Sequence, residues 1–184
     1  MNFNKHSALE GLHAPFGASK SAWIRYDDDK IVESYRNINA KEFGTRLHAF
    51  AAECIQLGVK LYPFGKTLDR YVNDAIGFRM SPEVVLYYSP HFFGTADAIS
   101  FRNKTLRIHD LKSGKSGHLE QLEVYAALFC LEYKVKPNDI TIILALYRED
   151  QVFTEEPDPD IIKGIMDKIK HFDSILSKLD EEEI

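Results

Sequence analysis

Residues 92–112 read FFGTADAISFRNKTLRIHDLK and predict two strands, residues 92–102 and 105–112, joined by a tight turn. Side chains on a strand alternate between its two faces, so Asp110 and Lys112 point the same way. The two residues before Asp110 on that face are leucine and isoleucine. The acid therefore stands at the rim of an apolar face, where a carboxylate is costly unless a cation lies near it.

A second carboxylate, Asp97, lies thirteen residues upstream on the first of these strands. Considered alone, Asp97 is more simply explained as an acid that is exposed, caps a backbone group or pairs with a basic side chain. Asp110 and Lys112 could likewise form an ion pair at the edge of a strand, which would contribute little to stability. Lys112 cannot neutralise both acids, whereas a divalent ion between them would. Carboxylate oxygens suit Mg²⁺ or Mn²⁺. Two acids and a lysine on one sheet are the parts of metal-assisted phosphodiester hydrolysis.

The spacing of apolar residues predicts an α/β protein with a mixed sheet flanked by helices. Residues 1–39 are rich in turn-forming side chains and predict irregular chain with one or two short helices. Beyond them we expect helices over residues 39–58, 68–77, 118–133 and 158–180, and further strands over residues 83–88 and 140–147. The predicted order of three strands, a helix and another strand requires a mixed sheet.

Composition places limits on the class of protein. The 184 residues fit a single domain, 1–184, made of an N-terminal extension (1–39), a core (40–148) and a C-terminal helix (158–180). The formal net charge of −5 argues against a protein coated in positive charge, although it leaves room for a local basic groove. We expect no membrane span and no secretory signal, and hence a cytoplasmic protein. Cys54 and Cys130 lie in apolar helical surroundings and are expected to be buried.

Three residues on predicted helices are further candidates for the site. Gln121 and Tyr125 are four residues apart, so they share a helix face shortly after the strand that carries Asp110. His48 has apolar neighbours at helical spacing. A histidine in that setting is more often a hydrogen-bonded core residue than a metal ligand, and beside the two acids we weigh the two readings about equally.

The chain resembles the PD-(D/E)XK nuclease superfamily, in particular its RecB-like exonuclease branch of the phage-encoded type. Four segments carry the resemblance, at residues 44–48, 94–97, 109–114 and 121–125. It implies a restriction-endonuclease-like core and Mg²⁺- or Mn²⁺-dependent DNA cleavage. The implied metal ligands and catalytic groups are His48, Asp97, Asp110, the Leu111 backbone carbonyl and Lys112, and the implied DNA-binding or supporting residues are Gln121, Tyr125 and Lys115.

The chain departs from the family pattern in two ways. Relatives often carry a glutamate four residues after the histidine, but here that position is Ala52 and Glu53 comes one residue later. In a regular helix the five-residue step turns Glu53 roughly 140° away from His48, so Glu53 would reach the same metal only through a distorted helix. Some relatives hold an iron–sulfur cluster with four cysteines, and two cysteines predict none.

Two functional hypotheses follow. The first is a metal-dependent deoxyribonuclease, most simply an exonuclease of phage recombination or DNA processing, acting in the cytoplasm of a bacterial host if it is phage-encoded. Its partners would be DNA and, as a candidate, a phage recombination protein, in a monomer or an oligomer. The alternative is a catalytically inactive nuclease-fold module that binds DNA or protein. Exonuclease or endonuclease action, strand polarity and strand preference depend on the shape of the cleft, which the residues named here do not determine.

Overall fold

A computed structural model describes residues 5–9, 11–114 and 117–182. Contacts divide the chain into two compact units, Met1–Thr45 and Arg46–Ile184. The first holds two 3₁₀ helices, η1 (Ser7–Leu9) and η2 (Ala18–Arg25), and the beginning of the helix α1 (Asp28–Leu57). The second holds the rest of α1 and all of the β-structure. None of the described helices is long and apolar enough to cross a membrane.

The helix α1 begins at Asp28, so the predicted start near Asn39 is wrong. Three consecutive aspartates, Asp27 to Asp29, fall within the stretch predicted as irregular, but they form the start of the helix. Asp27 accepts a hydrogen bond from the Lys30 N–H at 2.7 Å through its side chain, and its carbonyl accepts the Ile31 N–H at 3.0 Å. These are the bonds of an N-cap, and carboxylates in the first turn also favour a helix through its dipole.

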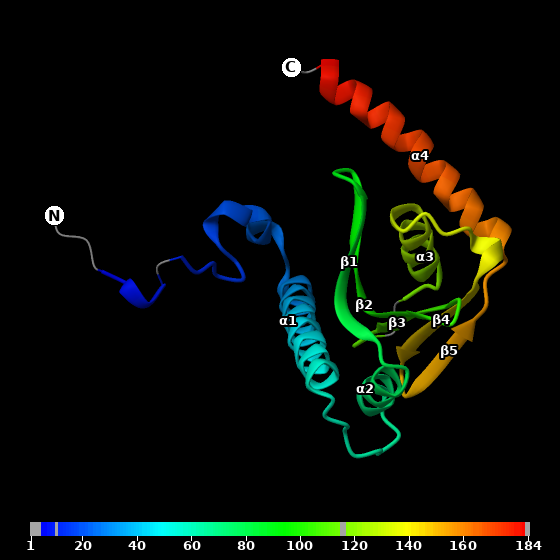
Figure 1. The fold of residues 1–184 in the computed structure, drawn as a ribbon. Coiled ribbons are helices and arrows are strands. Elements are labelled where there is room, and N and C mark those ends of the chain that lie inside the picture. The colour runs from blue at the N-terminus through cyan, green and yellow to red at the C-terminus, as the bar shows by residue number, and fades with distance from the viewer. Residues whose placement is uncertain (1–4, 10, 115–116, 183–184) are drawn as a thin grey trace. The chain divides into compact units, whose positions relative to one another are not determined.

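A five-stranded mixed sheet forms the centre of the second unit, with the strands in sequential order (Figure 1). The strands are β1 (Ser81–Ser89), β2 (Phe92–Arg102), β3 (Thr105–Leu111), β4 (Thr141–Arg148) and β5 (Gln151–Glu155). Only β3 and β4 pair in parallel. The crossover between them contains α3 (Glu120–Glu132) and the 3₁₀ helix η3 (Pro137–Asp139), because parallel neighbours cannot be joined by a hairpin. The expected α/β class with a mixed sheet is confirmed.

The strand β5 was not predicted from the sequence. It pairs with β4 through a two-residue turn at Glu149 and Asp150, both with positive φ, of 49° and 59°. Glycine or asparagine ordinarily marks such a turn, and neither is present. The strand is also short and mostly exposed, so it lacks the apolar alternation by which strands are recognised.

Helices pack on both faces of the sheet. On one face, Leu106 and Ile108 of β3 join a buried cluster with α3 and α4 (Pro159–Glu182). On the other face, Leu111 of β3 and Ala145 of β4 join a cluster with α2 (Thr67–Gly77) and the C-terminal part of α1. Cys54 is buried in the second cluster and Cys130 in the first. The end of β3 therefore emerges between two packed layers.

The hairpin of β1 and β2 extends beyond the rest of the sheet. Only residues 98–102 of β2 pair with β3, so residues 92–97 pair with β1 alone. Figure 1 shows this two-stranded ribbon rising from the sheet with α3 beside it. The place where β2 leaves β3 is a fork in the sheet, and the predicted acids stand there.

Candidate functional site

The two predicted acids stand where the β2–β3 ladder opens. Its last pair is Ala98 with His109, and the same register continued by one step would set Asp97 directly opposite Asp110. Beyond that pair, the Leu111 N–H donates its hydrogen bond to Asp97 Oδ2, at 2.9 Å, in place of a backbone carbonyl of β2. The side chain of Asp97 thus holds the fork open and keeps its own carboxylate beside the end of β3.

The packing of β2 also changes at Asp97. Ala96 belongs to the cluster under α3, whereas Ala98 belongs to the cluster under α2. Residues two apart on a regular strand share a face, so the strand is irregular at this position. Irregular pairs of strands re-aim side chains, and they are common beside active sites. Asp97 therefore leaves the regular alternation and points to the fork.

Asp110 is almost completely buried, with 2% of its surface exposed. Burial is the main reason that its pKa rises to about 6, and repulsion from Asp97 adds to the rise. Lys112 and, less strongly, His48 act in the opposite direction. Like charges facing each other across two strands are destabilising. A second cation at the fork would relieve a repulsion that Lys112 offsets only in part.

The Lys112 ammonium holds Asp110 and begins a chain of hydrogen bonds to α3. Its Nζ lies 3.0 Å from each oxygen of the Asp110 carboxylate, and only the contact to Oδ1 has the geometry of a hydrogen bond. The same ammonium donates to Gln121 Oε1 at 3.0 Å, and Gln121 Nε2 donates to the Tyr125 hydroxyl at 3.0 Å. The lysine thus sets the orientation of the amide, and the amide holds the phenol.

Among the described residues, the ligand atoms of His48, Glu83 and Asp97 lie within 4.8 Å of one another, a group able to hold a metal ion. His48 Nδ1 is 3.3 Å from Asp97 Oδ2. The hydrogen bond to Asp97 is the main reason that the pKa of His48 is raised, and burial opposes it. One imidazole and two carboxylates are a donor set suited to Mn²⁺ or Mg²⁺.

Glu83 was not among the residues selected from the sequence. The register of β1 against β2 runs from Pro82 with Ala98 to Val84 with Ala96, which brings Glu83 opposite Asp97. Glu83 has a φ of 51°, uncommon for a residue other than glycine, and such strain tends to gather at functional positions. Counting the hairpin register outward from its turn, where Ser89 pairs with Phe92, would have set Val84 opposite Asp97. A register shift between Tyr87 and Ser89 brings Glu83 there instead, and neither this shift nor the backbone conformation of Glu83 has a signal in the sequence.

The other predicted site residues are less close to this group. Glu53 is exposed on α1 and is not among the three residues whose ligand atoms meet. The Leu111 N–H bonds to Asp97, while the ligand role of the Leu111 carbonyl stays a prediction. Lys115 lies outside the described residues. His109, next to Asp110 in the sequence, is buried on the opposite side, where its Nδ1 is 3.3 Å from the Tyr147 hydroxyl.

Gly94 makes room for Tyr125. A Cβ atom added to Gly94 would lie 2.9 Å from the Tyr125 ring. We therefore expect Gly94→Ala to displace the phenol from Gln121, lower the free energy of unfolding by about 1–2 kcal/mol and weaken any activity that depends on Lys112. Urea denaturation and an activity assay test this. A matched change, Gly164→Ala, meets no atom within 4 Å in α4 and should stabilise by up to about 1 kcal/mol. Equal effects of the two changes would contradict the role given to Gly94.

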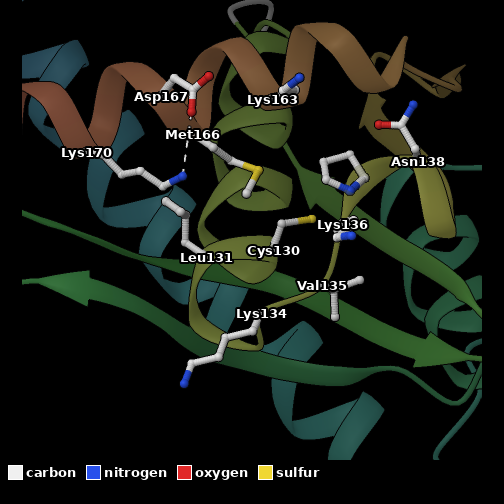
Figure 2. A pocket seen from close by; sticks show the side chains of 11 residues that line it. Cys130, Leu131, Lys134, Val135, Lys136, Asn138, Lys163, Met166, Asp167 and Lys170 are labelled. Carbon is white, nitrogen blue, oxygen red and sulfur yellow. Dashed lines mark ion pairs between the residues drawn. The ribbon is translucent and has the colours of Figure 1, made fainter.

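A separate hollow of about 540 Å³ lies between the end of α3, η3 and α4. Cys130 and Met166 contribute to its wall, and four lysines lie around it. Figure 2 shows Lys170 turned toward Asp167, with which it pairs at 3.6 Å, and Lys134 extending away from both. The lysines do not converge on one point, and none of the acids at the fork lines this hollow.

No family model matches the chain, and neither a curated protein nor a solved structure matches it.

Proposed function

We propose that this protein is a Mg²⁺- or Mn²⁺-dependent deoxyribonuclease with a restriction-endonuclease-like core. One observation carries the proposal: two carboxylates, Asp97 and Asp110, meet at the opening of a β-ladder, and a lysine is held on one of them at 3.0 Å. A structural ion pair between Asp110 and Lys112 does not need a second acid such as Asp97 at the same place, whereas two acids would hold the divalent cation of metal-assisted phosphodiester hydrolysis.

The donor atoms at the fork fit a divalent cation. His48, Glu83 and Asp97 bring their ligand atoms within 4.8 Å of one another. Asp110 is not in that group, but its buried Oδ2 makes no hydrogen bond within the described part of the chain and has only the ion pair with Lys112 at 3.0 Å. A buried carboxylate oxygen without a hydrogen bond is costly, and coordination would satisfy it. In this proposal His48, Glu83, Asp97 and Asp110 would hold the ion, which would supply Lewis acidity and lower the pKa of a coordinated water.

The remaining residues handle the proton and the orientation. Lys112 has 24% of its side chain exposed, so its ammonium faces both the Asp110 carboxylate and the solvent. It orients the attacking water and offsets charge that develops on the phosphate. Gln121 and Tyr125 keep the ammonium in place through the bonds described above and present polar groups to the DNA. Removal of either would loosen Lys112 without removing the metal ligands.

Exonuclease action and a role in phage recombination are parts of the proposal that depend on the resemblance in sequence. Digestion of end-labelled linear DNA and of closed circular DNA, each with Mn²⁺, Mg²⁺ or EDTA, tests them. We expect linear DNA alone to be degraded, and only with metal. Cleavage of the closed circular DNA would show that the protein is an endonuclease and not an exonuclease.

A catalytically inactive DNA- or protein-binding module is the competing function. Calorimetric titration with Mn²⁺ separates the two, because the module has no need of a metal at the fork. We expect one site per chain that is lost on replacing Asp97 or His48 by alanine. Absence of both metal binding and cleavage in a folded protein would refute the nuclease.

A further inference from the structure

The ribbon of β1 and β2 carries exposed apolar side chains that the core does not use. Val85, Tyr87 and Phe93 have 54%, 48% and 61% of their surfaces exposed. Tyr87 pairs with Phe93 across the two strands, and their ring centroids are 6.4 Å apart. Exposed apolar side chains that lie side by side are candidates for an interaction surface. We call these three residues the ribbon platform.

The ribbon platform lies on the face of the ribbon away from α3. The alternate residues of the ribbon point toward α3: Leu86 and Ala96 belong to the cluster that α3 covers, and Gly94 lies against Tyr125. His48 comes from α1, whose C-terminal part packs with α2 on the other side of the sheet. The platform is therefore on the side from which His48 reaches Asp97.

The platform is also in line with the fork. Phe93 is four residues before Asp97 on β2, and Tyr87 is four residues after Glu83 on β1. At the rise of a β-strand, four residues span about 13 Å. A nucleic-acid strand whose scissile phosphate lay at the acids would have its next few nucleotides beside the rings.

We infer that the ribbon platform stacks unpaired bases, and that the substrate is single-stranded DNA or the frayed end of a duplex. This inference rests on the proposed function, since it places the scissile phosphate at Asp97 and Asp110. Aromatic rings recognise any base through its flat face, and that face is available only when the base has left the duplex stack.

Binding rather than cleavage tests the inference, so its outcome is separate from that of the nuclease proposal. The full-length Asp110→Asn protein is titrated, with Mg²⁺ present, into three fluorescein-labelled probes of equal length: a deoxyadenosine strand, an abasic strand and a blunt duplex. The abasic strand keeps the phosphates and lacks the bases. We expect the deoxyadenosine strand to bind the most tightly.

Variants of the two rings then identify the platform. In the same background, Tyr87→Ala and Phe93→Ala should each weaken binding of the deoxyadenosine strand by about tenfold and leave the abasic strand unchanged. Tyr87→Trp and Phe93→Tyr keep a ring and should keep the affinity. Tyr62→Ala is the matched control, because Tyr62 is also exposed, at 73%, and lies in the loop between α1 and α2, where its ring is 4.7 Å from that of Phe64.

Two results would overturn the inference. One is equal binding of the deoxyadenosine and abasic strands, or tighter binding of the duplex, even if the wild-type enzyme cleaves DNA. The other is sedimentation of the wild-type chain as a dimer that Tyr87→Ala or Phe93→Ala converts to a monomer, which would make the platform an interface between copies. Base-dependent binding by a protein that does not cleave DNA would support the base-stacking role of the platform and refute the proposed nuclease activity.

Discussion

Replacement of Asp110 by asparagine should lower metal-dependent cleavage of linear DNA by about a thousandfold or more. The change keeps the shape of the side chain and removes the charge that faces Asp97 across the fork and pairs with Lys112. Asparagine offers a weaker ligand oxygen to the metal and no counter-charge to the ammonium. Initial rates on end-labelled linear DNA with saturating Mn²⁺ measure the effect.

Two companion variants make this result specific. Lys112→Ala keeps both acids and should still lower the rate by about a hundredfold or more. The attacking water and the charge that develops on the phosphate would both lose the Lys112 ammonium. Asp167→Asn is the matched control: this exposed acid lies on α4 and pairs with Lys170 at 3.6 Å, away from the fork. It should cleave at the wild-type rate. Robust cleavage by a well-folded Asp110→Asn protein would contradict the assigned site.

The same substitution should make the metal-free protein more stable at neutral and alkaline pH. Burial and Asp97 raise the pKa of Asp110 from 3.8 to about 6, so the folded protein holds this proton more tightly than the unfolded chain does. Stability of the wild type therefore falls as the pH rises from about 4 to about 6, and the loss persists above that range. A shift of this size corresponds to about 3 kcal/mol, which Asp110→Asn avoids.

Urea denaturation in EDTA at about pH 4 and about pH 8 measures the difference between the two proteins. We expect the advantage of Asp110→Asn to be about 2–3 kcal/mol larger at the higher pH. Saturating Mn²⁺ should then stabilise the wild type more than the variant, because a ligand of the folded state adds its binding free energy to stability. A difference that does not change with pH would show that Asp110 is not held in a desolvated, repulsive position.

Loss of cleavage together with a gain in metal-free stability in Asp110→Asn would show that Asp110 lowers the stability of the folded protein and is needed for its activity. A buried acid with a raised pKa, facing a second acid, is unfavourable in the protein without metal. A bound cation would offset this unfavourable free energy. A merely structural ion pair between Asp110 and Lys112 predicts the opposite sign, since removal of one partner would then lower the free energy of unfolding at neutral pH.

Local patterns in the sequence were enough to predict most of the secondary structure. The hairpin over residues 92–112, the continuous apolar strand β4 and the amphipathic helix α4 each repeat an apolar period along a single segment. The start of α1 was missed because a run of aspartates has the same composition whether it caps a helix or forms a turn. The strand β5 was missed because a short, exposed edge strand has almost no apolar period.

The candidate site divides in the same way. Asp97, Asp110, Lys112, Gln121 and Tyr125 were selected from the sequence, because alternation on a strand and four-residue spacing on a helix are local rules. Their meeting is a property of the fold: the ladder between β2 and β3 opens at Asp97, and α3 returns so that Gln121 reaches Lys112. No local rule states where a ladder stops, since that depends on which strands compete for the same backbone groups.

What the sequence determined by itself was the inventory of chemistry, namely two strand acids, a lysine, a histidine and an amide–phenol pair, together with the class of fold that carries them. Only the tertiary structure decided which of these residues are neighbours in space. Glu83 joined His48 and Asp97, Glu53 remained exposed on its helix, and Tyr87 and Phe93 were paired four residues along the ribbon from the fork. The physical reason is that pairing register and packing bring together residues distant in the chain, through interactions that act in space and leave no period along the sequence.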